Sequence, residues 1–149
     1  MTTPDYDTDF YAWAQQQAEA LRAKDLAALD VEHLAEEVDD LRNTERRAVR
    51  SQLRLILSHL LKWVYQPARR TDSWRSTIAN GRVLVQEDLE DLPSLAPELE
   101  AVAAWAYPWA RRDVAQETGL PLATFPEVCP WPVAQVLAED FWPEASSMS

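Results

Sequence analysis

Glycine, cysteine and histidine are scarce in this chain of 149 residues, and their scarcity narrows the possible structures. Two glycines and no alternation of β-branched residues argue against a protein built from strands and hairpins. The single cysteine, Cys129, excludes an intramolecular disulfide, which fits a reducing cytoplasm. No histidine lies near Cys129 in the sequence to act as a base, so we interpret its thiol as a buried structural group.

Long hydrophobic runs are also missing. No apolar stretch approaches the roughly 18 residues that a membrane-spanning helix needs. Residues 1–9 are acidic and polar, so we expect no secretory signal there. The sequence therefore predicts a cytoplasmic protein without a membrane partner.

The basic residues are unevenly distributed. Ten of the fourteen lie between Arg42 and Arg82 beside only two acids, so this stretch carries +8. The remainder holds four bases and twenty-three acids, or −19, which gives the net charge of −11. So acidic a total argues against a general nucleic-acid-binding protein, because such domains are usually basic. The central positive charge must then be neutralised by flanking segments, by a second copy or by another molecule.

Helical periodicity runs through most of the chain and predicts an all-α fold, a bundle of about five main helices plus a short C-terminal helix. Apolar residues recur at steps of three and four, and prolines fall where the pattern starts or stops. The expected helices span about 7–23, 30–42, 44–66, 74–92, 97–118 and 132–140. Capping residues are expected at 7–8 for the first helix and at 72–73 for the fourth. A tight break at Asn43 would make 30–66 a hairpin, although one kinked helix satisfies the same pattern.

The two glycines have different expected roles. Gly81 lies on the inner stripe of helix 74–92, where a missing side chain permits close approach of a neighbouring helix. Gly119 precedes Leu120-Pro121 and should end its helix in the left-handed conformation. We expect a single domain over residues 1–144 and a disordered tail at 145–149.

Five short motifs stand out along the chain. They are Tyr6-x-x-Asp9-Phe10-Tyr11-x-Trp13, Glu36-Glu37-x-x-Asp40-Leu41, His59-Leu60-Leu61-Lys62-Trp63-x-Tyr65-Gln66-Pro67, Ser73-Trp74-Arg75-x-Thr77-Ile78 and Phe125-Pro126-x-x-Cys129-Pro130. With them the chain resembles, over roughly residues 6–143, a bacterial family catalogued as domain of unknown function number twenty-nine, common in cyanobacteria and proteobacteria. The run from 59 to 67 is the most specific part. The resemblance implies an all-helical fold and transfers no catalytic residue.

The acidic helix 30–42 is one candidate site. Its expected inner face consists of Val31, Leu34, Val38 and Leu41. On another side, His33, Glu37 and Asp40 fall at steps of four and three, with Glu36 beside them. Carboxylates so placed could hold a metal ion, and one alternative is a metal-dependent hydrolase of phosphorylated small molecules using Glu36, Glu37 and Asp40. No matching second unit follows at the usual spacing, so the sequence favours a solvated acidic face and predicts no cofactor.

The basic segment is the other candidate. Arg46, Arg50 and Arg54 form a row on one flank of helix 44–66, and in a hairpin the acidic helix would neutralise this row. Alternatively, the segment Arg46–Arg75 binds RNA, DNA or an acidic protein surface, including a second copy. We favour a non-enzymatic protein–protein interaction or self-associating module. The residues expected to take part are Arg46, Arg50, Arg54, His59, Trp63 and Trp74. A purely packing role for His59 and Trp63 stays open.

Overall fold

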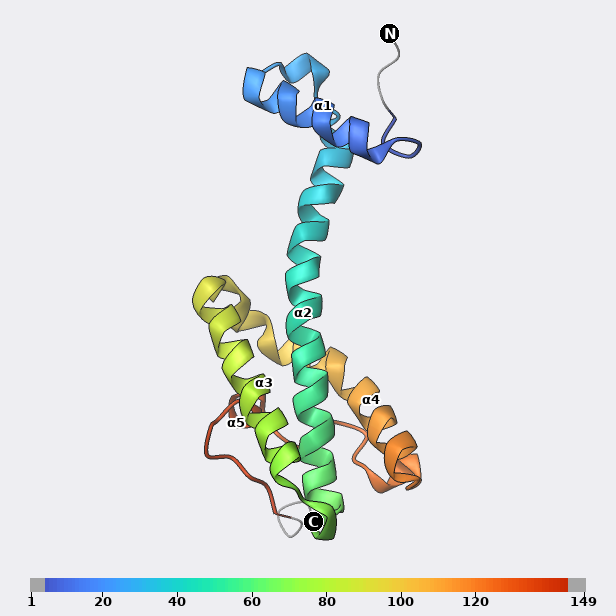
Figure 1. Ribbon diagram of the computed structural model, residues 1–149, viewed down its shortest axis with the longest axis vertical. Helices are drawn as coiled ribbons and strands as arrows, with labels where there is room; N and C mark the ends of the chain where they lie inside the picture. The colour runs from blue at the N-terminus through green and yellow to red at the C-terminus, as the bar shows by residue number, and fades with distance from the viewer. Residues whose placement is uncertain (1–4, 145–149) are drawn as a thin grey trace. The chain divides into compact units, whose positions relative to one another are not determined.

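The computed structural model describes residues 5–144, and in these residues the all-α prediction is confirmed: 77% of the described residues are helical and none of them forms a strand. The helices are α1 (Phe10–Ala23), α2 (Val31–Tyr65), α3 (Asp72–Asp91), α4 (Leu99–Thr118) and α5 (Val133–Val136) (Figure 1). Short 3-10 turns lie between them, at η1 (Leu26–Ala28), η2 (Pro67–Arg69), η3 (Pro93–Glu98) and η4 (Leu122–Thr124). None of the described helices is long and apolar enough to cross a membrane. The predicted tail, 145–149, lies outside the described residues.

The expected break at Asn43 is wrong, because α2 is one helix of 35 residues. Asparagine and threonine cost only a few tenths of a kcal/mol more than the better helix formers, which a long helix easily tolerates. The Thr44 hydroxyl donates to the carbonyl of Asp40 at 2.8 Å, within the same helix, instead of capping a new one. The predicted hairpin of 30–66 therefore does not form, and one long helix replaces two of the expected main helices.

Other helix ends also differ from the predicted ones. Asp9 caps α1 and Thr71 caps α3, each accepting from the backbone N–H three residues on at 3.1 Å. The expected caps at 7–8 and 72–73 are thus off by one or two residues. The last helix is much shorter than 132–140. Gly119 does end α4 with a φ of 75°, as predicted.

The described chain divides into two compact units. Unit 1 comprises the described residues up to Glu45, and unit 2 begins at Arg46, so the division falls within α2. The large hydrophobic core belongs to unit 2 and is built on the apolar stripe of α2. Its α2 members are Val49, Leu53, Ile56, Leu57, Leu60, Leu61 and Val64. Partners from α3, α4 and α5 include Ile78, Val85, Val102, Ala106, Ala110, Val114 and Val136.

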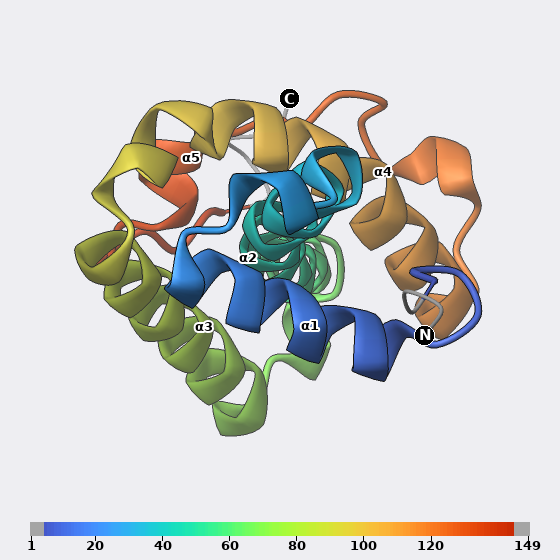
Figure 2. The same ribbon diagram turned by 90° about the horizontal axis from the view of Figure 1, so that it is seen from above.

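At Gly81, helix α3 packs directly against Ile56 of α2. In both views α3 and α4 lie on different sides of the C-terminal part of α2 (Figures 1 and 2). A Cβ atom built at Gly81 would lie 2.7 Å from Cγ1 and 3.1 Å from Cδ1 of Ile56. Ile56 is fully buried and its β-branched side chain has little rotational freedom. The predicted close approach at Gly81 is therefore confirmed.

We expect Gly81→Ala to destabilise the protein by about 1–2 kcal/mol. Overpacking of a core costs roughly 1–3 kcal/mol, and the better helix propensity of alanine offsets up to about 1 kcal/mol. Chemical denaturation should show that the same substitution becomes neutral or stabilising when Ile56→Ala removes both crowded atoms. An equal loss in the two backgrounds would contradict the steric explanation.

Arg82 on α3 holds the segment of residues 136–141 against the rest of unit 2. Its side chain is 4% exposed, and the guanidinium group donates to three backbone carbonyls. The distances are 2.9 Å to Val136, 3.4 Å to Glu139 and 2.7 Å to Phe141. Burial lowers the pKa of Arg82, and these carbonyl dipoles replace the water that the charge has lost. Trp142 covers the group at 5.1 Å from its ring centroid.

Arg82→Met should destabilise the protein by about 2–3 kcal/mol, because hydrogen bonds to a charged group contribute more than neutral ones. Arg75→Met is the matched control. Arg75 also stacks on Trp142, at 5.0 Å, but it is exposed. Its replacement should cost less than about 1 kcal/mol. Equal losses of unfolding free energy in the two variants would show that stacking, and not carbonyl binding, holds this segment.

Candidate interaction surface

The row of arginines on α2 finds its counter-ions on η3 and α4. Arg54 forms a bidentate pair with Asp113, with Nε at 2.6 Å and Nη2 at 2.8 Å from the carboxylate oxygens. Arg46 Nε lies 3.5 Å from Glu98 Oε1, a contact without hydrogen-bond geometry. The expectation that the acidic helix 30–42 would neutralise the row is therefore wrong, because it required the hairpin that α2 does not form.

Two tryptophans of α4 lie under the same arginines. The guanidinium carbon of Arg50 is 3.6 Å from the ring centroid of Trp105. The ring of Trp109 is approached by Arg54 at 5.6 Å and by Arg112 at 5.1 Å. Cation–π attraction of this kind contributes about 0.5–1 kcal/mol at exposed sites.

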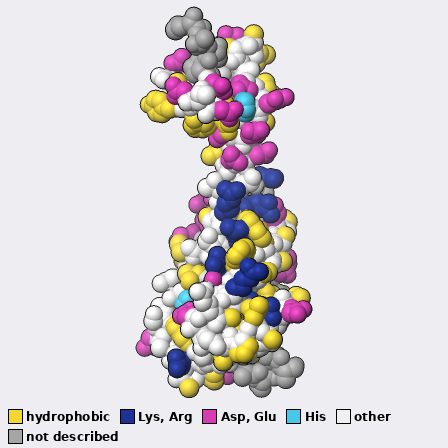
Figure 3. Space-filling view, turned by 90° about the vertical axis from the view of Figure 1, so that its right-hand side faces the viewer, with side chains coloured by type: hydrophobic (Ala, Val, Ile, Leu, Met, Phe, Trp, Pro, Cys, Tyr) yellow, Lys and Arg dark blue, Asp and Glu magenta, His cyan; other side chains and the backbone are white. Residues whose placement is uncertain are grey.

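These residues form one surface of unit 2. Arg47 is exposed and lies three and seven residues before Arg50 and Arg54, on the same side of α2. Trp105 is 41% and Trp109 43% exposed. We call this surface the arginine–tryptophan face, and its members are Arg46, Arg47, Arg50, Arg54, Trp105, Trp109 and Arg112. Figure 3 shows basic side chains gathered in one band with hydrophobic side chains among them.

The other predicted flank of α2 is occupied by packing contacts. Trp63 is buried, lies 4.9 Å from the ring of Trp142, and is covered by Arg70 at 4.6 Å. Its Nε1 has no hydrogen-bond partner among residues 5–144. Trp74 is half-buried beneath the ammonium group of Lys62, at 4.9 Å. Trp63 and Trp74 thus lie within unit 2 and not on the arginine–tryptophan face.

His59 makes its hydrogen bond within its own helix. Its Nδ1 is 2.9 Å from the carbonyl oxygen of Leu55, one turn earlier in α2. Burial lowers the pKa of His59, which favours the neutral ring. A neutral, half-buried imidazole bonded to its own helix resembles a packing group more than a charged anchor.

The acidic residues of unit 1 take part in local hydrogen bonds. Asp30 Oδ2 accepts from Nε1 of Trp13 at 3.1 Å and lies 2.7 Å from Nδ1 of His33. The ring of Tyr6 stacks on His33 at 4.1 Å, and its hydroxyl donates to Glu37, which raises the pKa of Tyr6 to about 12. No cluster of three metal-ligating side chains occurs within residues 5–144. Glu36, Glu37 and Asp40 are therefore not brought together as a metal site there.

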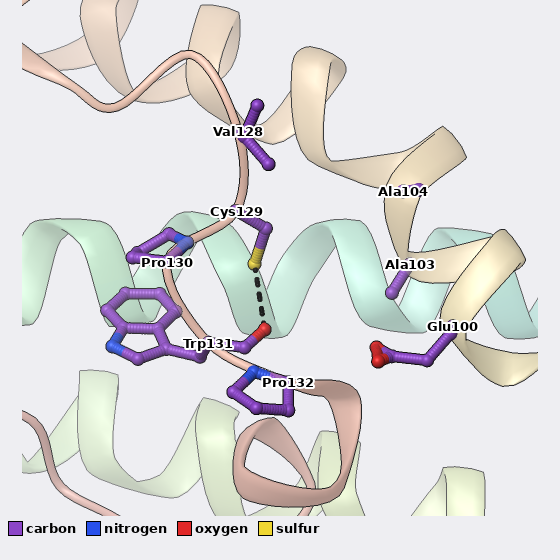
Figure 4. A pocket seen from close by; sticks show the side chains of 8 residues that line it. All are labelled: Glu100, Ala103, Ala104, Val128, Cys129, Pro130, Trp131 and Pro132. Carbon is purple, nitrogen blue, oxygen red and sulfur yellow. Dashed lines mark hydrogen bonds between the residues drawn. The ribbon is translucent and has the colours of Figure 1, made fainter.

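Cys129 lies in a cavity of about 500 Å³ beside Glu100 and Trp131 (Figure 4). Its Sγ donates to the carbonyl oxygen of Trp131 at 3.3 Å. Burial raises the pKa of the thiol, and the Glu100 carboxylate adds to that effect. Glu100 itself accepts from the backbone N–H of Val133 at 2.9 Å and so caps α5. A protonated thiol beside a capping carboxylate fits the predicted structural role.

The two α4 tryptophans of the face, Trp105 and Trp109, were not among the residues predicted from the sequence. Trp105 and Trp109 are four residues apart, and Arg112 follows three residues later, so they share one side of α4. That spacing was the available signal. It could not by itself show that the side faces the arginines of α2.

The chain belongs to the family described as Domain of unknown function DUF29, whose model matches residues 6–142. The match agrees with the resemblance seen in the sequence motifs. No curated protein and no solved structure matches the chain significantly.

The pKa values of the two histidines should lie on opposite sides of 6.5, the ordinary value for histidine. The hydrogen bond that the His33 ring donates to Asp30 raises the pKa of His33, whereas burial lowers the pKa of His59. Two-dimensional NMR of the ring protons against pH measures both values. Asp30→Asn should lower the pKa of His33 and leave that of His59 unchanged, and an unchanged His33 would contradict the pairing.

The pair of Asp30 and His33 also determines how the stability of the protein changes with pH. Because the folded-state pKa of His33 is raised, its contribution is fully present below 6.5 and is lost as the pH rises through the folded value. The difference in unfolding free energy between the parent chain and His33→Gln should therefore shrink as the pH rises through that value and level off above it.

Proposed function

We propose that this protein is a non-enzymatic cytoplasmic module that associates with protein, most directly with a second copy of itself, through the arginine–tryptophan face. The observation that carries the proposal is the pair of Trp105 and Trp109, large rings left about two-fifths exposed beneath guanidinium groups. Tryptophan and arginine are the residue types enriched where interfaces derive most of their binding energy. Their stacking keeps them ordered before binding, which lowers the entropy cost of association.

The charge of the face favours an acidic partner. It holds five arginines, whereas its ion pairs supply two carboxylates, Glu98 and Asp113. Residues 1–45 of the same chain contain twelve acids and three bases, or −9, so a second copy offers acidic surface. Nucleic acid is a poorer fit, because the whole chain carries −11 and would be repelled by phosphate.

Sedimentation velocity tests the proposal. The full chain should self-associate more strongly at about 0.05 M than at about 0.5 M salt, because exposed charges are screened over a shorter distance at high salt. Arg50→Glu should weaken the association. Arg69→Glu is the matched control, since it makes the same charge change at an exposed residue of η2 away from the face. A chain that stays monomeric at high concentration and low salt would refute self-association.

Each of the two alternative functions predicts a different experimental result. Binding of RNA that weakens with salt and with Arg50→Glu, in a chain that remains monomeric, would favour a nucleic-acid-binding role. Heat released on titration with magnesium, manganese or zinc, and lost in Glu37→Gln, would favour the hydrolase hypothesis.

A further inference from the structure

Unit 1 has an apolar groove that its described residues, 5–45, leave uncovered. The groove has a volume of about 510 Å³ and lies between the end of α1 and the start of α2. It is lined by Leu21, Leu29, Val31, Leu34, Val38 and Asp39. Val31 is 67%, Val38 63% and Leu41 70% exposed. These residues belong to the stripe that the sequence predicts to face inward, so that prediction is wrong for most of the stripe: no helix among residues 5–45 covers it.

The groove is apolar inside and acidic around it. Its residues on α2 recur at steps of three and four, the spacing with which one helix receives another. Glu32, Glu36 and Asp39 lie on the same turns of α2 and are exposed. Unit 1 as a whole carries −9 of the net −11. An occupant that matches both properties presents apolar rings together with positive charge.

We infer that the groove receives the arginine–tryptophan face of a second copy of the chain, an inference that rests on the proposed function. Trp105 and Trp109 supply the apolar rings, and Arg47 and Arg50, which form no ion pair within the described residues, supply the charge. The groove therefore matches this face in both polarity and sign.

Charge disfavours the pairing of like surfaces. Contact between two grooves would bring together two units that each carry −9, and contact between two faces would oppose five arginines to five. Contact between unlike surfaces removes both repulsions. When two copies are related by a twofold axis, each groove meets the face of the other copy, so the contact is made twice and the assembly closes as a dimer.

Reversal of charge on each surface separates this arrangement from the alternatives. The face variant carries Arg47→Glu and Arg50→Glu, and the groove variant carries Glu36→Lys and Asp39→Lys. All four positions are in helix α2, and none takes part in a hydrogen bond or ion pair within residues 5–144. Circular dichroism should show that both variants keep the helical content of the parent.

Sedimentation velocity of each variant alone should give a dimer dissociation constant at least roughly tenfold above that of the parent, because each then presents like charges across the contact. An equimolar mixture of the two variants should associate again, to within about threefold of the parent. In the mixture every contact joins opposite charges: glutamate faces meet lysine grooves, and arginine faces meet acidic grooves.

Two controls and one uncharged variant complete the experiment. Glu87→Lys with Glu90→Lys on α3 reverses two exposed acids at the same spacing of three residues, outside the groove, and should leave the dimer intact. Arg69→Glu reverses the charge of an exposed base away from the arginine–tryptophan face, and it should also leave the dimer intact. Val38→Asn removes apolar character from the groove without changing charge, and it should weaken the dimer in proportion to the lost burial.

The outcomes distinguish this inference from the proposed function. A dimer that weakens with the face variant but not with the groove variant, and that the mixture does not restore, would overturn the groove as the partner surface and leave self-association through the face in place. A dimer unaffected by the face variant would overturn both. Association of the chain with zwitterionic vesicles that Val38→Asn abolishes, without any dimer, would show that the groove serves a lipid surface instead.

Discussion

The rotation of α2 about its axis determines where its own candidate interaction residues point. Seven apolar side chains between Val49 and Val64 are buried in the core of unit 2, and burying each contributes about 1.5–3 kcal/mol, so any other rotation is strongly disfavoured. With that stripe fixed inward, Arg46, Arg50 and Arg54 follow on the adjacent side and meet η3 and α4. The ion pair between Arg54 and Asp113 orients α2 and α4 more than it stabilises the protein, because both groups are partly solvated.

Much of the fold could be read from the residues themselves. Gly81 and Gly119 each have a local physical reason, close approach and positive φ, and both were predictable. Asn43 led to a wrong prediction of a helix break, because the helical turns on both sides outweigh its small helix penalty. Periodicity showed that the start of α2 is amphipathic, but it could not show whether this chain supplies a cover for Val31 and Val38. The partner of Arg54 lies 59 residues away, and no local pattern encodes such a pairing.

The carboxylates of unit 1 illustrate how a chemical motif can serve structure. In the sequence, Glu37 and its neighbours imitate part of a metal-binding turn. In the structure, Glu37 accepts from Tyr6, and Asp30 accepts from Trp13 and lies in hydrogen-bond contact with His33. Of the three candidate metal ligands, Glu37 thus holds a tyrosine hydroxyl, while Glu36 and Asp40 are exposed. The remaining acids are solvated and set the sign of the surface, which is why the groove and the arginine–tryptophan face differ so strongly in charge.

Arg82 has a consequence for how freely the C-terminal segment can change. Its three donors bind main-chain oxygens of residues 136, 139 and 141, and such atoms are present whatever side chain a residue carries. Outward-facing positions such as Glu139 can therefore drift in identity without loosening the attachment. Tolerance of this kind lets a terminal segment acquire new surface chemistry while its path over the core stays the same.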